Sequence, residues 1–488
     1  MTEVRDVLHF ILNDRQVSLR EVPATRTLLD FLRLDRGLRG SKEGCAEGDC
    51  GACTVLVGRL SGDELVYETV NACICFVGSL DGAHVVTIEH LSAPGGLLHP
   101  VQQAMVAEHG SQCGFCTPGI VMSLYALWMR EPKPDRGQVE HALQGNLCRC
   151  TGYAPIVRAA TGISTYGDAA ADPLVVERAA MRERLLALRD GRRVEIGEDR
   201  NRFIIPANAD DLAAVYAAEP DATLVAGATD VGLWVTKFMR EIGPLVFIGK
   251  IPELHRVELG DGSLRLGAGV TYTEAAGVIL QHFPQLRDFW ARIGGDQVRN
   301  MGTVGGNIAN GSPIGDTPPP LIALGATVTL RHGDARRKLP LEDFFIAYGK
   351  QDRRPGEFVE SVSVPLLPAD EHFACYKITK RKDEDISSLC GAFRVRLDNA
   401  GVVEAVRIAF GGMAATPKRA RAVEAALLGR SWDAATIEGV LPAFAEDFQP
   451  LTDMRASAAY RLLAAQNLLR RFHLETTGQA QRLRREVA

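Results

Sequence analysis

The sequence contains no uninterrupted apolar run of the roughly 18 residues that a membrane-spanning helix needs. The net charge is only −5 at pH 7, so no basic excess indicates nucleic-acid binding. The first 19 residues carry neither an apolar signal core nor a twin-arginine pair, and we therefore expect a cytoplasmic protein. Low-complexity tracts and repeated units are also missing. With 46% hydrophobic and 24% charged residues, 488 residues suggest roughly three or four globular domains.

The eleven cysteines are distributed unevenly, because nine of them precede residue 151. A disulfide framework is not expected in a long chain without an export signal. Cys375 and Cys390 stand apart from each other and from the rest. The close spacing of the other nine favours metal binding.

The first group of cysteines has the spacing C-x4-C-x2-C, formed by Cys45, Cys50 and Cys53. This spacing, followed by a distant fourth cysteine, is that of plant-type ferredoxins, which hold a [2Fe–2S] cluster. Either Cys73 or Cys75 in "VNACIC" can supply the fourth thiolate. Structural zinc is the alternative, although zinc sites favour two short Cys-x2-Cys pairs.

Three glycines, Gly44, Gly48 and Gly51, lie among these cysteines. Glycine permits backbone turns that a Cβ atom would resist, so one loop can wrap closely around a cluster. Such a loop also leaves backbone N–H groups directed at the sulfurs, which adjusts the reduction potential.

The second group consists of two tight pairs, Cys113 with Cys116 and Cys148 with Cys150. The apolar pattern between them predicts two helices, separated where Pro132 and Pro134 interrupt it. The pairs are then expected at helix ends that face each other. A lone CxxC could be a thioredoxin-like redox site, but the CxC partner favours a second cluster over that reading and over zinc.

Changes in composition and periodicity divide the chain into modules. A small sheet with one helix is followed by a helical module, a linker with one charged helix, a β-rich module with glycine-rich loops, and a last module that begins with alternating strands. The predicted boundaries are 1–90, 91–165, 166–195, 196–368 and 369–488.

Two polar, glycine-rich loops occur in the stretch "TVGGNIANGSPIGD". Loops of this kind present backbone N–H groups to phosphate oxygens. Neither loop fits G-x-G-x-x-G, so a Rossmann fold is not indicated. Taken alone, the loops are equally compatible with tight turns in a β-rich domain.

The order of these parts resembles the iron–sulfur and FAD chain of the xanthine dehydrogenase family of molybdenum hydroxylases. The motifs that carry the resemblance span nearly the whole chain: "GCAEGDCGACTV", "VNAC", "QCGFCTPG", "GNLCRCTGY", "LVAGATDVG", "TVGGNIANGSPIGD" and "FGGMA". The resemblance implies an α+β multidomain protein. Its parts would be a plant-type ferredoxin β-grasp domain, a helical-bundle [2Fe–2S] domain, a two-part α+β FAD-binding domain of the vanillyl-alcohol-oxidase type, and a C-terminal α+β flavoprotein domain.

The resemblance also implies which residues hold the cofactors. It selects Cys73 over Cys75 as the last ligand of the first cluster, and it assigns the four cysteines of the second group to the second cluster. Flavin positions of the family correspond to Leu224, Val225, Ala226, Gly227, Ala228, Thr229, Asp230, Val231, Thr303, Val304, Gly305, Gly306, Asn307, Asp316, Val359 and Lys377. Ile293 falls on a flavin-contacting position where relatives have an aromatic residue. Tyr348 and the loop "TKRKDEDISS" match a segment beside the flavin ring that controls NAD access, or the loop is simply a charged surface loop.

In this family a molybdopterin-bearing subunit hydroxylates the substrate. The resemblance thus implies that electrons from xanthine or hypoxanthine pass through two [2Fe–2S] clusters to FAD and then to NAD+, as a step of purine catabolism. The molybdopterin would lie only on the partner, and an (αβ)2 heterotetramer is expected. No catalytic acid, base or nucleophile is expected on this chain. The same role for an aldehyde, a nicotinate-like heterocycle or carbon monoxide is the alternative, as are a zinc-stapled binding module and a standalone NAD-dependent reductase.

Overall fold

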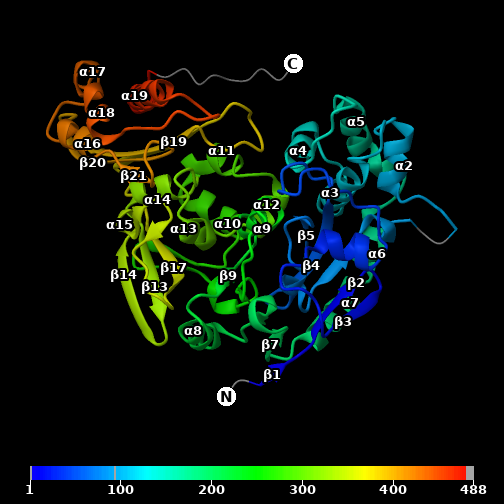
Figure 1. Ribbon diagram of the computed structural model, residues 1–488. Helices are drawn as coiled ribbons and strands as arrows, with labels where there is room; N and C mark the ends of the chain where they lie inside the picture. Colours follow the sequence, from blue (N-terminus) through cyan, green and yellow to red (C-terminus); the bar gives the residue numbers. More distant parts are fainter. Residues whose placement is uncertain (1–2, 93–94, 480–488) are drawn as a thin grey trace.

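The computed structural model describes residues 3–92 and 95–479 as an α+β chain with several sheets. Figure 1 shows two halves, with the N-terminal modules on one side and the glycine-rich and C-terminal modules on the other. In the described part of the chain, no helix is long and apolar enough to cross a membrane.

The N-terminal domain is a five-stranded sheet that covers a short helical segment. The strands run in the order β3 (Arg15–Leu19), β2 (Leu8–Leu12), β6 (His84–Val86), β4 (Thr54–Ser61) and β5 (Glu64–Asn71). Asn13 turns the chain between β2 and β3 with a φ of 54°. Thr27 caps α1 (Leu28–Asp30), as the sequence predicts, by accepting a hydrogen bond from the Asp30 N–H.

The second domain is helical. Its helices are α2 (Pro100–Ala107), α3 (Thr117–Arg130), α4 (Arg136–Ala142) and α5 (Ala154–Gly162). The prediction of two helices between the cysteine pairs is confirmed by α3 and α4. α3 is buried over most of its length because it packs against β4 and β5 as well as its helical neighbours. Asp135 begins α4 with a capping box.

The segment that was expected to be a linker is firmly packed. It holds α6 (Pro173–Val176) and α7 (Arg178–Leu188), and α7 contacts β2, β4 and β5. Asp172 anchors its start, because its carboxylate accepts hydrogen bonds from Tyr125 Oη at 2.6 Å and contacts His99 Nε2 at 2.8 Å. The predicted boundary at residue 195 falls inside a strand, β7 (Arg193–Ile196).

The module predicted at residues 196–368 contains two sheets, and the first of them includes a strand from the chain's N-terminal end. Its order is β1 (Val4–Arg5), β7, β8 (Phe203–Ile205), β10 (Leu245–Phe247) and β9 (Thr223–Val225). β1 pairs in parallel with β7, joining residues that are nearly 190 positions apart in the sequence. The stretch "TLVAGATDV" forms β9 in its first three residues, continues as a loop and reaches α9 at Val231.

The second sheet of this module is antiparallel. Its order is β11 (Val257–Gly260), β12 (Ser263–Gly267), β17 (Phe358–Pro365), β13 (Thr327–His332) and β14 (Ala335–Pro340). The accompanying helices are α8 (Ala209–Ala218), α9 (Val231–Thr236), α10 (Tyr272–His282), α11 (Arg287–Trp290), α12 (Asp296–Met301), α13 (Val304–Asn310), α14 (Pro318–Leu324) and α15 (Leu341–Phe344). A short hairpin joins β15 (Phe345–Ala347) to β16 (Lys350–Gln351).

The C-terminal domain is a sheet covered by helices. Its strands are β18 (Glu371–Ile378), β19 (Leu389–Leu397), β20 (Val403–Gly411) and β21 (Lys418–Arg419). Its helices are α16 (Arg421–Leu427), α17 (Ala434–Val440), α18 (Phe444–Asp447) and α19 (Ala458–Thr476). α19 is the longest of these helices, with 19 residues.

α12 connects the two halves of the molecule and packs directly on β5 of the N-terminal domain. Its Gln297 is 1% exposed, and the Nε2 atom lies 3.1 Å from Thr54 Oγ1, 3.2 Å from Ser123 Oγ and 3.0 Å from Asn146 Oδ1. One amide group therefore meets acceptors from both cysteine-bearing domains. Its neighbour Asn300 donates to the Thr69 carbonyl at 2.9 Å.

Candidate functional site

The first group of cysteines brings four thiols together at the edge of the N-terminal sheet. The Cys45 thiol contacts those of Cys50 and Cys73, and Cys73 also contacts Cys53. Cys75 points elsewhere, with its sulfur 3.6 Å from Ser79 Oγ. Of the two candidates for the fourth ligand, Cys73 is thus the one that lies with the other three thiols.

The loop around these thiols directs backbone N–H groups at a sulfur and has glycine where a side chain would not fit. The backbone N–H groups of Glu47 and Cys50 donate to Cys45 Sγ at 3.5 and 3.4 Å. A Cβ atom on Gly44 would lie 2.8 Å from Cys50 Sγ, so a side chain there would displace the thiol. Gly48 has a φ of 79°, a conformation that L residues with side chains rarely adopt.

The second group lies where the helical domain meets solvent. The Cys113 thiol contacts Cys150, and Cys116 contacts Cys148. Cys113 and Cys150 are exposed, whereas Cys148 is buried. The prediction that the two pairs face each other is confirmed.

Contacts link the four thiols of the first group into one set, whereas the four thiols of the second group meet as two contacting pairs. In residues 3–92 and 95–479, no three His, Cys, Asp or Glu side chains are arranged to hold one metal ion. A [2Fe–2S] cluster takes four thiolates shared between two irons. Each group brings four thiols together, and that donor set fits such a cluster.

The two cysteine groups approach each other through their backbones. The Leu147 N–H, next to Cys148, donates to the Cys50 carbonyl at 2.9 Å. A Cβ atom on Gly51 would lie only 2.0 Å from the Gly145 carbonyl oxygen. The role of Gly51 is therefore to let the two domains come close, which the sequence did not reveal.

A cavity of about 980 Å³ lies between the first cysteine loop and the glycine-rich loops. Its volume is at the upper end of the range for ligand pockets. Glu47, Gly48 and Asp49, which belong to the first cysteine loop, form part of its wall. α9 holds that loop in place, because Thr236 Oγ1 donates to the Ala46 carbonyl at 2.6 Å. The order in space is therefore the second cysteine group, the first cysteine group and the cavity.

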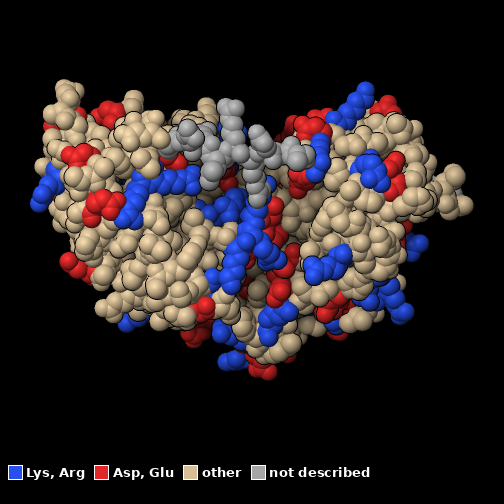
Figure 2. Space-filling model, turned by 90° about the horizontal axis from the view of Figure 1, so that it is seen from above, with Lys and Arg blue, Asp and Glu red and all other residues tan. Residues whose placement is uncertain are grey.

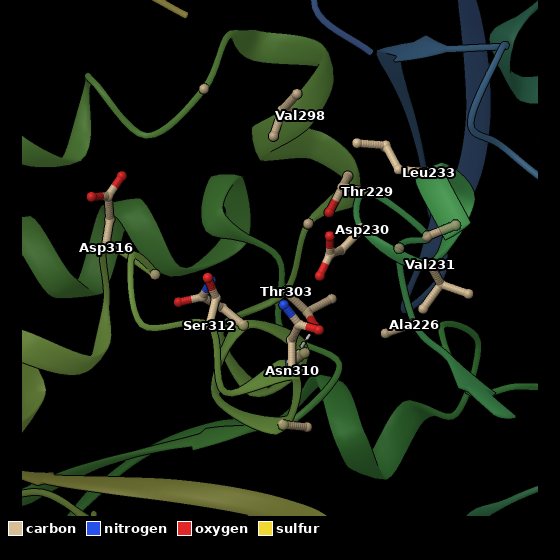
Figure 3. A pocket seen from close by; sticks show the side chains of 18 of the residues that line it. Ala226, Thr229, Asp230, Val231, Leu233, Val298, Thr303, Asn310, Ser312 and Asp316 are labelled. Carbon is tan, nitrogen blue, oxygen red and sulfur yellow. Dashed lines mark hydrogen bonds between the residues drawn. The ribbon is translucent and has the colours of Figure 1, made fainter. Parts of the chain in front are cut away.

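Two glycine-containing loops line this cavity: the loop after β9, residues 226–230, and the glycine-rich stretch that begins at Thr303; they are called the two glycine-rich loops from here on. A Cβ atom on Gly227 would lie 1.6 Å from the Met301 carbonyl oxygen, and one on Gly305 would lie 2.4 Å from the Ala268 Cα atom. These glycines are required by close packing of backbone on backbone. Thr303 caps α13, since its hydroxyl accepts a hydrogen bond from the Gly306 N–H at 2.9 Å. Figure 3 shows Asp230 and Thr303 extending into the same space from the two loops.

Most of the predicted flavin residues line the cavity. They are Leu224, Ala226, Gly227, Ala228, Thr229, Asp230, Val231, Thr303, Gly305, Gly306, Asn307, Asp316, Val359 and Lys377. The Val225 and Val304 side chains instead lie in hydrophobic cores, because alternate residues of these segments point away from the cavity. Ile293 is part of the lining, whereas Tyr348 lies outside it and is 76% exposed.

Charged groups are arranged along the cavity. Lys377 forms a buried ion pair with Asp316, which also accepts a hydrogen bond from Ser387 at 2.6 Å. Burial raises the pKa of Asp230. Lys380, Arg381 and Arg455 line another part of the wall. Figure 2 shows Lys and Arg side chains concentrated along the seam between the two halves.

Sequence reasoning missed two parts of the lining. Arg353 and Tyr216, whose side chains share a hydrogen bond of 2.9 Å, belong to segments with no recognisable motif. Glu384 was grouped with a charged loop, but its Oε1 atom is buried. Neither contact is visible as a local pattern, because each depends on packing between distant segments.

Four family models match consecutive parts of the chain. They are described as the 2Fe-2S iron–sulfur cluster binding domain (residues 10–78), the [2Fe-2S] binding domain (87–161), the FAD binding domain in molybdopterin dehydrogenase (198–367) and the CO dehydrogenase flavoprotein C-terminal domain (374–476). The chain belongs to the molybdenum hydroxylase family. The matches confirm the resemblance and the predicted α+β multidomain fold. They support two [2Fe–2S] clusters and FAD as the cofactors of this molybdenum hydroxylase chain, which fit an electron-transfer role in an oxidoreductase.

The chain is also similar in sequence to xanthine dehydrogenases. Xanthine dehydrogenase of Emericella nidulans is 33% identical over 97% of this chain and 39% of its own length. Xanthine dehydrogenase/oxidase of Rattus norvegicus is 32% identical over 92% of this chain and 37% of its own length. The chain thus spans less than two fifths of these relatives.

Solved structures are similar to part of the chain. Carbon monoxide dehydrogenase from Hydrogenophaga pseudoflava has a TM-score of 0.54 and 26% identity, covering 57% of this chain and 98% of that chain. Quinoline 2-oxidoreductase from Pseudomonas putida 86 has a TM-score of 0.51 and 27% identity, covering 56% of this chain and 96% of that chain.

Proposed function

We propose that this chain is the electron-transfer part of a xanthine dehydrogenase. It would take electrons from a molybdopterin-bearing partner that hydroxylates xanthine or hypoxanthine, and pass them through two [2Fe–2S] clusters to FAD and then to NAD+. The clusters and the flavin supply the redox chemistry, and the residues of this chain position them and adjust their potentials.

The order of the three sites is the observation that carries this proposal. The first cysteine group stands between the second group and the cavity, and its own loop forms part of the cavity wall. The hydrogen bond from Leu147 to the Cys50 carbonyl joins the two cysteine loops. A chain that relays electrons needs its centres in such a sequence.

Each site has a donor set that suits its cofactor. We propose that Cys45, Cys50, Cys53 and Cys73 hold the first cluster and that Cys113, Cys116, Cys148 and Cys150 hold the second. We propose that FAD binds in the cavity, against the two glycine-rich loops, Asp316, Val359 and Lys377. Val225 and Val304 would contribute through their backbones, since their side chains are in the cores. The proposed division into domains is the one given above, with β1 joining the sheet of the FAD-binding part.

The second cysteine group supports a partner at that end of the molecule. Cys113 and Cys150 are exposed, and Phe115 and Leu147 beside them are 46% and 54% exposed. Apolar side chains around a redox centre give a partner protein a surface to cover. We propose the molybdopterin-bearing subunit as that partner, in an (αβ)2 heterotetramer in the cytoplasm.

The choice of xanthine is supported by the extent of the similarity. The named xanthine dehydrogenases align with more than nine tenths of this chain, whereas the carbon monoxide and quinoline enzymes cover less than three fifths. Oxidation of an aldehyde, a nicotinate-like heterocycle or carbon monoxide by the partner is the alternative.

The first test is the composition of the purified chain. About four irons, four acid-labile sulfides and one FAD per chain are expected for two [2Fe–2S] clusters and one flavin. NADH should then bleach the flavin and the clusters in a rapid-mixing experiment. Zinc in place of iron, with no flavin, would overturn the proposal.

The substrate requires a second test. The chain is produced together with a candidate molybdopterin-bearing subunit, and NADH formation is measured with xanthine, an aldehyde, nicotinate and carbon monoxide. Xanthine-dependent NADH formation is expected. Turnover with one of the other compounds only would assign the chain to that enzyme and not to xanthine dehydrogenase.

A further inference from the structure

One acidic side chain in the cavity wall is not explained by cofactor binding. Glu384 belongs to the loop between β18 and β19, and its side chain lines the cavity together with Lys377 and Ile293. Its Oε1 atom is buried and makes no hydrogen bond of ordinary geometry in the described part of the chain, and the Gly295 N–H is the backbone donor that faces the carboxyl group. Burying an ionised carboxylate with so few partners is costly, so such a group favours its neutral form.

The backbone of Glu384 is also unusual. Its φ is 48°, in the left-handed region that residues other than glycine and asparagine seldom occupy. Strained backbone of this kind persists only where surrounding contacts hold it, and it is concentrated at functional sites. With this backbone conformation the Glu384 Oε1 atom is buried, whereas Ile386, two residues further along the loop, is 49% exposed.

The surroundings make room for this carboxyl group. A Cβ atom on Gly295 would lie 2.3 Å from Glu384 Oε1 and 2.6 Å from the Gly145 Cα atom. Glycine at position 295 therefore allows three segments to meet: the cavity loop, α12 and the helical domain.

Groups from the first cysteine loop, from the start of α12 and from the loop of Glu384 itself affect the pKa of this side chain. Burial, and to a lesser extent Asp49 of the first cysteine loop, raise the pKa of Glu384, whereas the Gly295 N–H, Arg299 and Arg381 lower it. The net result is a pKa of about 8. At neutral pH the side chain is thus a buried acid that carries its proton.

We propose that Glu384 is the proton donor of this cavity, a role that rests on the function proposed above. When two electrons arrive from the clusters, oxidised flavin needs one proton to become the reduced form that donates hydride. Glu384 supplies that proton and becomes a carboxylate, which takes a proton back from water at the exposed side of the loop near Ile386. Transfer of that hydride to NAD+ would carry away both electrons and the proton and leave the bound flavin oxidised.

The test follows the infrared difference spectrum over time while the purified, cofactor-containing chain is reduced. Wild type should lose a carboxylic acid C=O band when the flavin takes up the proton and regain it when water returns the proton, and Glu384→Gln should lack that transient change. Mixing with dithionite should bleach the FAD of Glu384→Gln about 100-fold more slowly, at the lower end of what a positioned general acid contributes. Asp383→Asn is the matched control on the same loop. Its carboxylate accepts a hydrogen bond from Gln144 at 2.9 Å, and the control should keep the band.

The outcomes separate this proposal from the one it rests on. Wild type without FAD would overturn both proposals. FAD present at full content, with an unchanged band in Glu384→Gln, would overturn the role of Glu384 alone. If Glu384→Gln does not fold, Glu384→Asp decides: the band shifts in frequency if residue 384 is the acid and stays in place if it is not.

Discussion

Among the contacts that hold the N-terminal domain against the FAD-binding part is one buried carboxylate, that of Asp81, and replacing it should loosen this attachment. Asp81 accepts hydrogen bonds from Arg5 Nη2 at 2.9 Å, from the His9 N–H at 3.0 Å and from Lys250 Nζ at 2.9 Å. Arg5 lies in β1, which has joined the sheet of the other half. Asp81→Asn keeps the shape of the side chain and removes its charge.

The loss of unfolding free energy in Asp81→Asn can be estimated from the burial of the ion pair. The Arg5 and Asp81 side chains are 5% and 7% exposed. Removing one member of a buried ion pair leaves the other charge uncompensated, which typically costs about 3–5 kcal/mol. Asp190 still contacts Arg5 at 3.0 Å in the variant, so we expect the lower end, about 3 kcal/mol.

The pH dependence has a definite sign. Burial alone would raise the pKa of Asp81, but Lys250 and Arg5 outweigh it and hold the pKa below its usual value. A carboxylate with a lowered pKa stabilises the fold fully above its unfolded pKa, near 4, and loses that contribution as the pH falls through the folded value. The difference between wild type and Asp81→Asn should therefore be constant from pH 5 to 8.

Urea unfolding, followed by the visible absorbance of the clusters, measures the effect. With a slope of about 3 kcal/mol per molar urea, the midpoint should fall by about 1 M. The control is Asp6→Asn, which breaks the pair with Arg20 at a site where both side chains are more than 60% exposed; such pairs contribute about 0–1 kcal/mol. A shift in Asp81→Asn no larger than in this control would refute the reasoning.

Three further predictions concern the cofactor sites. Cys148→Ser should remove one [2Fe–2S] signal in electron paramagnetic resonance and keep the other; two signals at full intensity would contradict the ligand assignment. Cys75→Ser should keep both signals, because its thiol faces Ser79, and loss of the first would make Cys75 a ligand. Gly306→Val should lower the FAD content measured after extraction, since its Cβ would lie 2.7 Å from Thr303 Oγ1 and a branched side chain would alter the cap of α13. Unchanged flavin content would remove this loop from the site.

The local cysteine pattern predicts part of the first metal site but not its fourth ligand. The spacing of Cys45, Cys50 and Cys53 is itself a folding constraint, because three thiols within nine residues can meet only around a loop. The choice between Cys73 and Cys75 is different. Both lie in one short stretch, and the direction of each side chain depends on how the turn after β5 packs.

Long-range pairing was beyond sequence reasoning. β1 contains only two residues, and nothing in its composition indicates that it pairs with β7. The glycine-rich loops were recognised, but the contact of Gly227 with the Met301 carbonyl joins segments more than 70 residues apart. Cys375 and Cys390, which appeared unrelated, lie side by side on neighbouring strands with their sulfurs 3.8 Å apart.

The sequence by itself determined the cofactor chemistry, since the identity and spacing of the cysteines and glycines establish which groups can be bound. Only the tertiary structure decided how the sites are connected. The approach of Gly51 to Gly145, the contacts of Gln297 with two domains and the inward turn of Glu384 all arise where separate domains pack. Packing between distant segments leaves no periodicity in either segment, and so these contacts become visible only in the folded chain.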